Sequence, residues 1–235
     1  MCLYGDTQAL PDLSRSFRPL AGTRAPSGPL QATRGNPHQA IGWDSAAQLD
    51  RFLTAYEEVY ADAPYNEGPS DVAEFIDHYA VHARRVGMRL VLAAENQEVV
   101  GFTYGYYLAP DTRWWRNLQD VTLPDDYTRE DGRRTFVVIE PAVRKAWRRG
   151  GVAAALHAQL IGDLDAGRVT LTVRPEAEAE AARSAYKAWG YRKVGVSRPW
   201  VGHRCTTAWF AISAELAAVP RVDAPFYDAM MLTLG

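Results

Sequence analysis

Residues 140–157 read Glu-Pro-Ala-Val-Arg-Lys-Ala-Trp-Arg-Arg-Gly-Gly-Val-Ala-Ala-Ala-Leu-His, a pattern that predicts a strand, a turn with paired glycines and an alanine-rich helix. Gly150 and Gly151 can take positive φ at little steric cost and let a ligand come close to the backbone. The first N–H groups of the helix and the positive end of its dipole attract an anion. The junction therefore predicts a phosphate-binding turn.

The motifs around this turn narrow the kind of phosphate ligand. An ATP or GTP loop would end in Gly-Lys-Ser/Thr, and a dinucleotide fold would carry Gly-x-Gly-x-x-Gly; neither is present. The chain has Arg148-x-x-Gly151-x-Ala153, which resembles the acyl-coenzyme A signature of the GCN5-related N-acetyltransferase (GNAT) family. Residues 182–191 resemble the helix of that family that ends in Tyr-x-x-x-Gly-Phe/Tyr. A glycine-containing turn without a ligand is the open alternative.

Composition limits the class of protein. The 235 residues carry a formal charge of −2 and a pI near 6.2, which gives no global attraction to nucleic acid or to an anionic membrane. Cys2 and Cys205 are too few for a disulfide framework and lack metal-ligand spacing, so we expect a cytoplasmic protein. We find no run of about 20 apolar residues that would span a bilayer.

Periodicity predicts the order of elements. Residues 1–37 hold five prolines and read as an N-terminal extension, followed by a single domain over 38–235. Residues 109–134 read as a long, polar, mobile loop, and 198–226 as an insertion between the last two strands, with a helix at 211–218. Helices are expected at 45–60, from Ser70 or Asp71 onward, at 152–164 and at 176–189, and strands at 88–94, 99–108, 135–144, 169–173, 191–197 and 227–234.

This order of elements is that of an α/β protein with a mixed sheet. It is also the order of the GNAT family. The resemblance implies a central, mostly antiparallel, mixed sheet of about six to seven strands flanked by about four helices. It covers roughly residues 40–197 and the last strand.

Two residues are candidates for acid–base chemistry. The resemblance implies that Glu140, on the strand before the turn, accepts a proton from an amine, and that Tyr186 donates one to the thiolate of coenzyme A. A glutamate that positions water or pairs with an arginine is the alternative for Glu140. A core tyrosine is the alternative for Tyr186.

The resemblance also implies acetyl-CoA as acyl donor. Its pyrophosphate would lie on the backbone N–H groups of the turn, and its pantetheine arm would pair with the strand that precedes it. Pro141 predicts a bulge that separates this strand from the next and opens a slot for the arm. The residues expected to bind the donor are Val143, Arg144, Arg148, Arg149, Gly150, Gly151, Val152 and Ala153.

The acceptor is expected to be a primary amine of a small molecule, held by aromatic and acidic side chains. The candidates are Tyr65, Asn66, Glu67, Tyr104, Tyr106, Trp114 and Trp115, for which ordinary core packing is the alternative. His78 and His82 lack a third ligand, so no metal site is expected.

Other readings stay open. One is a catalytically silent domain that binds acyl-CoA as a sensor, and another is an enzyme that acetylates protein or peptide amines. An exposed last strand or the insertion could join two copies, so a homodimer also stays open.

Overall fold

The computed structural model describes residues 45–63, 65–197, 209–215 and 228–233. The boundary expected at residues 37/38 lies outside these ranges. In chain order the described elements are α1 (Ser45–Ala61), α2 (Pro69–His82), β1 (Arg89–Glu95), β2 (Glu98–Tyr107), η1 (Trp114–Asn117), α3 (Asp125–Thr128), β3 (Thr135–Val143), η2 (Lys145–Trp147), α4 (Val152–Ile161), β4 (Arg168–Val173), η3 (Ala177–Ala179), α5 (Glu180–Ala188), β5 (Arg192–Ser197), β6 (Trp209–Glu215) and β7 (Asp228–Thr233).

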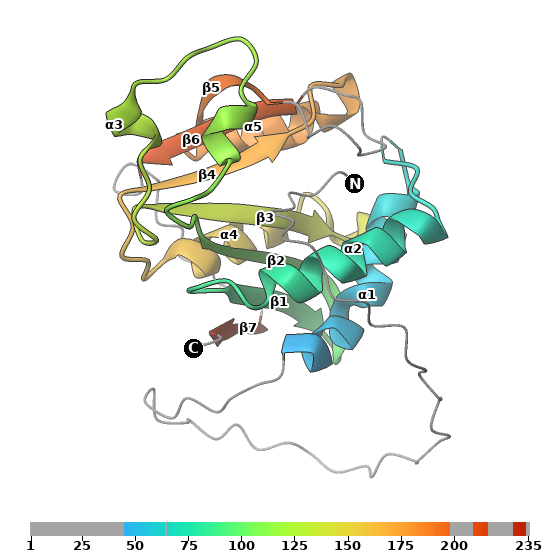
Figure 1. The fold of residues 1–235 in the computed structure, drawn as a ribbon. Helices are drawn as coiled ribbons and strands as arrows, with labels where there is room; N and C mark the ends of the chain where they lie inside the picture. Colours follow the sequence, from blue (N-terminus) through green and yellow to red (C-terminus); the bar gives the residue numbers. More distant parts are fainter. Residues whose placement is uncertain (1–44, 64, 198–208, 216–227, 234–235) are drawn as a thin grey trace.

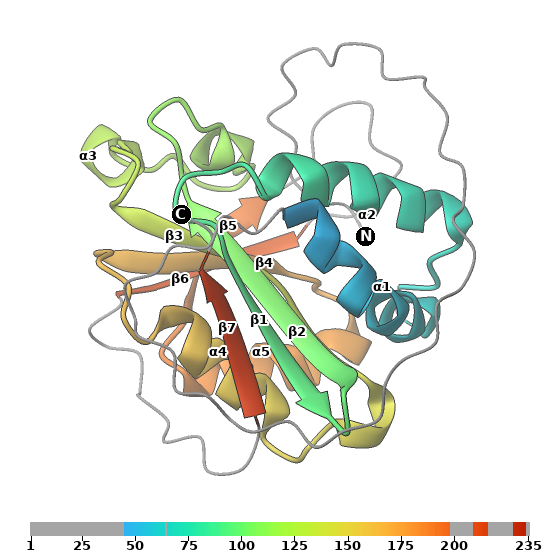
Figure 2. The ribbon, with the colours of Figure 1, turned by 90° about the horizontal axis from the view of Figure 1, so that it is seen from below.

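The described strands form one sheet of seven, in the order β5-β6-β4-β3-β2-β1-β7 (Figures 1 and 2). All neighbouring pairs are antiparallel except β3 and β4, which run parallel. The hairpin of β1 and β2 turns at Asn96 and Gln97, whose φ values are 50° and 69°. The mixed, mostly antiparallel sheet confirms the predicted fold class.

Helices cover both faces of the sheet (Figures 1 and 2). On one face, α1 and α2 bury an aromatic core against β2, in which Phe52 and Tyr56 of α1 each contact Phe75 of α2 and Phe102 of β2. On the other face, α4 and α5 form a second core with alternate residues of the same strands. The period of two along each strand separates the cores. No described helix has the length and apolar character needed to cross a bilayer.

Two sequence expectations about these elements are wrong. The helix expected over residues 211–218 is not formed by their described part, 211–215, because Trp209–Glu215 is β6, hydrogen-bonded between β4 and β5. Segment 198–226 therefore contributes a strand to the sheet and is not only an insertion. The second helix begins after Gly68, not at a Ser70 or Asp71 cap; the Asp71 carboxylate instead accepts a hydrogen bond from the Gly68 N–H at 2.9 Å.

Segment 109–134 packs on the part of the sheet that α1 and α2 leave open. Its helix α3 lies beside β4 and β6 in Figure 1, and the Gln119 N–H donates to the Val196 carbonyl at 2.8 Å. Its side chains join the same core as α1 and α2. The segment therefore forms a packed layer, with two short helical turns, in place of the expected polar loop.

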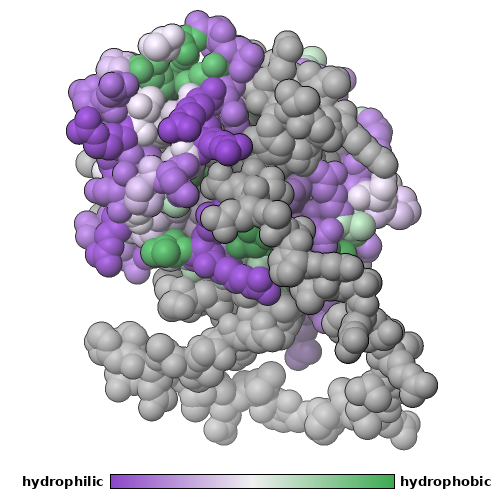
Figure 3. Space-filling model, in the orientation of Figure 1, coloured by the Kyte–Doolittle hydropathy of each residue, from purple (hydrophilic) through white to green (hydrophobic). Residues whose placement is uncertain are grey.

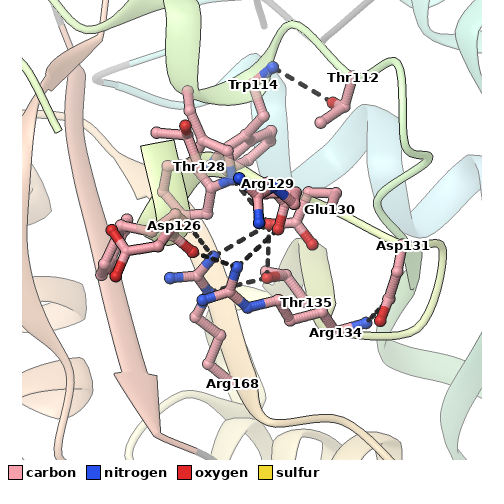
Figure 4. A network of polar contacts seen from close by, with 12 residues as sticks. Thr112, Trp114, Asp126, Thr128, Arg129, Glu130, Asp131, Arg134, Thr135 and Arg168 are labelled. Atoms are coloured by element: carbon pink, nitrogen blue, oxygen red, sulfur yellow. Dashed lines mark hydrogen bonds and ion pairs between the residues drawn. The ribbon is translucent and has the colours of Figure 1, made fainter. Parts of the chain in front are cut away.

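A buried ion pair fixes this segment to the starts of β3 and β4 (Figure 4). The Arg168 guanidinium lies 3.1 Å from Glu130 Oε1, and both side chains are almost fully buried, at 4% and 0% exposed. Thr135 Oγ1 and Trp115 Nε1 donate to the same oxygen, each at 2.8 Å. The Arg168 guanidinium also stacks over the rings of Trp115 and Tyr127, at 4.7 and 4.1 Å. The polar contacts of Glu130 all converge on Oε1, whereas its buried Oε2 accepts no hydrogen bond from the described residues.

Removing one partner of this pair should cost far more stability than removing both. We expect Glu130→Leu and Arg168→Met each to lower the free energy of unfolding by about 3–5 kcal/mol, because each leaves an uncompensated buried charge. The double variant should lose clearly less than the sum. A urea-denaturation double-mutant cycle measures this coupling, with the exposed pair Lys145 and Asp62 as control. Additive losses in the buried pair would contradict the expectation.

His157 is a second buried polar residue, on the α4 and α5 face. It is 3% exposed, its ring stacks on Trp189 at 4.5 Å, and its Nε2 lies 2.9 Å from the Tyr191 hydroxyl. Burial lowers the pKa of His157 from 6.5 to about 4. The imidazole is therefore neutral in the folded protein at neutral pH.

This lowered pKa predicts a loss of stability in acid. The unfolded chain binds a proton at His157 below pH 6.5, whereas the folded chain does so only near pH 4. The stabilisation is thus complete above pH 6.5 and is lost as the pH falls toward 4, by about 3 kcal/mol in total. Chemical denaturation at several pH values should show that the free energy of unfolding falls less steeply with falling pH in His157→Gln than in the unchanged protein. Leu160 packs in the same core and does not titrate, so Leu160→Ala should lower the free energy of unfolding equally at each pH.

Candidate active site

The parting of β3 and β4 defines the site. The two parallel strands pair only from Thr135 to Val137, opposite Arg168 to Thr170. Beyond these three pairs both strands continue, to Val143 and Val173, without pairing to each other within the described residues. The facing edges of their carboxyl-terminal halves are therefore open to a ligand that can hydrogen-bond to a strand.

A bulge in β3 lies on this open half. Phe102 of β2 pairs with Ala142, and Tyr104 pairs with Ile139, so Glu140 and Pro141 together oppose a single residue. Proline has no N–H for the ladder, which explains the irregularity at this point. The structure thus confirms the bulge that Pro141 predicted. Glu140 lies in this bulge, and its side chain is outside the described part.

The turn after β3 has the alternating backbone of an anion-binding site. Arg149 has φ 70° and Gly151, the N-cap of α4, has φ 85°. The left-handed conformations therefore fall on Arg149 and Gly151, not on both glycines as expected. Residues 148–151 are exposed, and a Cβ built on Gly151 would meet no atom within 4 Å. Left-handed residues next to a helix start turn successive N–H groups toward one point, which suits a phosphate.

The residues before this turn differ in where their side chains go. Arg148 Nε donates to the carbonyl of Val143 at 2.9 Å, which ties the turn to the end of β3. Arg144 is buried and forms ion pairs with Glu58 of α1, at 2.7 Å, and with Glu98. Its guanidinium is thus engaged by α1 and the hairpin, so the expected contact of the Arg144 side chain with the donor is not supported.

Tyr186 lies in an aromatic cluster between α4 and α5. It is 7% exposed, and its ring meets those of Trp189 and Tyr191 edge to face, each at 5.6 Å. The same core contains Val152 at the start of α4 and Val173 at the end of β4. Tyr186 is therefore a core residue on the face of the sheet that α4 covers.

The loop between α1 and α2 meets the end of β4. The Arg174 guanidinium lies 5.1 Å from the centroid of the Tyr65 ring, and Arg174 pairs loosely with Glu176 at 3.9 Å. Burial raises the pKa of Tyr65, which Arg174, Glu67, Arg148 and Glu176 also influence. Tyr65 therefore lies within electrostatic range of Arg148, the residue that opens the turn before α4.

Two residues near the end of β4 were not among the site residues predicted from the sequence. Arg174 and Glu176 follow directly on β4, at the end where it leaves β3. That position was the available signal, because ligands of open sheets gather at carboxyl ends of strands. Glu67 is held in place by Tyr56, whose hydroxyl donates to Glu67 Oε2 at 2.5 Å, whereas Asn66 is exposed with φ 50°.

Four predicted pocket residues are core residues instead. Tyr104 is 0% exposed and its hydroxyl lies 3.2 Å from His82 Nδ1, while Tyr106 packs against the His82 ring. Trp114 and Trp115, in η1 of segment 109–134, are buried in the core that this segment shares with α1 and α2. Their burial corrects the expectation that they line an acceptor pocket. Within the described residues no group of three or more potential ligands could hold a metal ion.

Comparisons with known proteins identify the fold. No family model matches the sequence, and no curated protein matches it. A structure from Desulfovibrio desulfuricans, described as an acetyltransferase of the GNAT family, matches with a TM-score of 0.50 and 16% identity over 76% of this chain and 96% of that one. PH1933 from Pyrococcus horikoshii matches with a TM-score of 0.50 and 15% identity, covering 75% and 96%. An aminoglycoside 6'-N-acetyltransferase with coenzyme A gives 0.48 and 15%, covering 81% and 96%.

The fold belongs to the α/β class, with helices on both faces of the sheet. Two further features define it, the separation of the parallel strands β3 and β4 and the glycine turn before α4. More narrowly, it is the fold of the GNAT acetyltransferases. At such identities the likeness shows the fold, and function has to be argued from the site.

The turn gives a direct test of its backbone. Gly151→Ala should lower the free energy of unfolding by about 1 kcal/mol or more, because φ 85° is strained for a residue with a Cβ. Gly150→Ala is the matched control, since its φ is not positive, and should cost little. Thermal and urea denaturation of both variants measure the difference. Equal losses would show that the left-handed position has been misassigned.

Proposed function

We propose that this protein is an acetyl-CoA-dependent N-acetyltransferase that acetylates a primary amine of a small molecule. The observation that carries the proposal is the opening between β3 and β4 next to the exposed turn at 148–151. A strand edge accepts an amide-rich chain, and the turn accepts phosphate, so together they match the two parts of coenzyme A. The GNAT fold supports the same assignment.

The turn and the strand would share the binding of the donor. Backbone N–H groups of residues 149–153 would hold the pyrophosphate, with the exposed Arg149 adding a charge-assisted contact. The pantetheine arm would pair with the backbone of β3 near Val143, where β4 has moved away. Arg148, tied to the Val143 carbonyl, would stiffen the connection between these two parts.

Direct transfer needs two proton movements. An alkylamine has a pKa of about 10.4, so a base must take a proton before or during attack. Glu140, in the bulge, is the proposed base. As the amine nitrogen bonds to the thioester carbon and the carbon–sulfur bond breaks, the thiolate leaves with a proton from Tyr186. We propose no covalent enzyme intermediate.

The acceptor would lie between the α1–α2 loop and the end of β4. The Tyr65 ring and the carboxylates of Glu67 and Glu176 suit a protonated amine before it loses its proton. The position of segment 109–134 supports a small acceptor. The segment contacts the end of β5 that lies near the end of β4, where Asp120 Oδ1 accepts a hydrogen bond from the Val196 N–H at 2.6 Å. A walled site favours a small molecule over a protein surface.

The decisive experiment combines binding with turnover. We expect acetyl-CoA to bind in calorimetric titration and a pool of small amines to release thiol. Tyr186→Phe and Glu140→Gln should keep binding and lower kcat by about 100-fold or more. Gly151→Val should abolish binding, because a branched side chain fills the phosphate space. Tyr127→Phe is the matched control, because the Tyr127 ring of α3 packs against Arg168 at the start of β4, away from the turn. It should leave the binding of acetyl-CoA and kcat unchanged.

The alternatives give different outcomes. Binding without thiol release from any small amine, but with release from peptides, would indicate a protein acetyltransferase. Binding without release from either would indicate an acyl-CoA sensor. No binding of acetyl-CoA would overturn the proposal.

A further inference from the structure

A separate cavity lies at the opposite end of β2 and β3. Its volume is about 560 Å³, and its walls come from residues 84–86 after α2, from Tyr107, Ala109 and Pro110 after β2, and from the turn at 131–133. Tyr107 pairs with Phe136, whereas Gly101 pairs with Val143 just before the phosphate turn. Six residues of strand separate these positions, or about 20 Å. The cavity is therefore distinct from the candidate active site.

The walls carry an excess of positive charge. Three arginines are among the lining residues, Arg84, Arg85 and Arg133, against a single acidic residue, Asp131. Asp131 Oδ1 already accepts the N–H groups of Arg133 and Arg134, at 2.8 and 2.7 Å, so it is engaged by its own turn. Such a lining attracts an anion.

Two of these arginines remain available to a ligand. Arg84 and Arg133 are exposed, and no ion pair found among the described residues involves either of them. They come from different segments of the chain, one at the end of α2 and one before β3. Two arginines from different segments that line one cavity can hold a carboxylate or phosphate between them.

The floor of the cavity is an aromatic ring held in one position. The Tyr107 ring packs against Gly87, where an added Cβ would lie 2.4 Å from the Tyr107 Cδ2 atom. It meets the Phe136 ring edge to face at 5.3 Å, and the Tyr107 N–H donates to the Val86 carbonyl at 3.2 Å. Gly87, with φ 67°, is thus required for this close approach.

An exposed apolar side chain stands beside the arginines. Val86 lines the cavity and is 72% exposed. Val86 and Val121 are the two large hydrophobic side chains that the described residues leave exposed, and the described surface on the face in Figure 3 is mostly hydrophilic. An apolar side chain next to a fixed ring and free guanidinium groups suits a ligand with an apolar body and an anionic head.

We infer that this cavity binds a small organic anion, with its carboxylate or phosphate between Arg84 and Arg133 and its apolar or aromatic body on Tyr107 and Val86. This second site does not depend on the proposed acetyltransferase activity.

The test titrates the full chain with phenyl phosphate, in the presence of saturating coenzyme A to occupy the candidate active site. Inorganic phosphate and phenol, which each represent one half of the probe, are titrated separately. Amide chemical shifts should move at residues 84–86, 107–110 and 131–133. Phenyl phosphate should bind more tightly than inorganic phosphate, and phenol should not bind. Arg84→Gln with Arg133→Gln should raise the dissociation constant by about tenfold or more. Val86→Asp should also weaken binding.

The control removes the same charge elsewhere. Lys187→Gln with Arg192→Gln, both exposed, should leave the constant unchanged. Benzoate replaces phenyl phosphate in a second arm, and tighter binding of one would identify the preferred head group. Shifts confined to residues 149–153, or equal weakening by both double variants, would overturn the inference. If coenzyme A itself fails to bind, the same shift map without it still decides the question.

Discussion

The limited pairing of β3 with β4 is the constraint on which the rest of the structure depends. Three parallel residue pairs hold the strands together, and beyond Val137 and Thr170 they separate. A parallel sheet would normally continue its ladder, since unpaired N–H and C=O groups cost free energy unless water or a ligand meets them. The bulge at Glu140 and Pro141 helps to direct β3 away. The open edge of β3 then leads toward the start of α4, so that the strand and the helix terminus could bind one ligand together.

Such an opening needs a strong closure at its other end. The Arg168–Glu130 pair provides it, because Arg168 is the first residue of β4 and its Nε donates to Thr135, the first residue of β3, at 2.8 Å. Glu130 connects both to segment 109–134. Arg fits this position better than Lys would, since its planar group can contact a carboxylate, a hydroxyl and two aromatic faces at once. The polar cluster thus specifies the point from which the strands diverge.

Prediction from the sequence succeeded where the chemistry of a single residue restricts the local backbone. Pro141 cannot donate to a ladder, and Gly151 permits φ 85°, so the bulge and the turn were predictable from single residues. It failed where the environment decides. The alanine-rich residues 211–218 suggested a helix, yet β4 and β5 pair with Trp209–Glu215 on both sides and hold it as a strand. Trp114 and Tyr104 suggested the walls of a pocket, but both are buried. Their burial follows from the register of the sheet and from the packing of segment 109–134, and these depend on contacts between residues far apart in the chain.

Arg149 shows how the turn itself is selected. A non-glycine residue in the left-handed region costs about 1 kcal/mol, and Gly150, its neighbour, could have taken that conformation freely. The structure instead places Arg149 at φ 70° and Gly151 at φ 85°. This alternation gathers the N–H groups around the exposed start of α4 and keeps a guanidinium beside them. Strain that persists at an exposed turn is typical of a binding site, where the ligand repays it. The same backbone that costs stability in the free protein is therefore the one that a phosphate would stabilise.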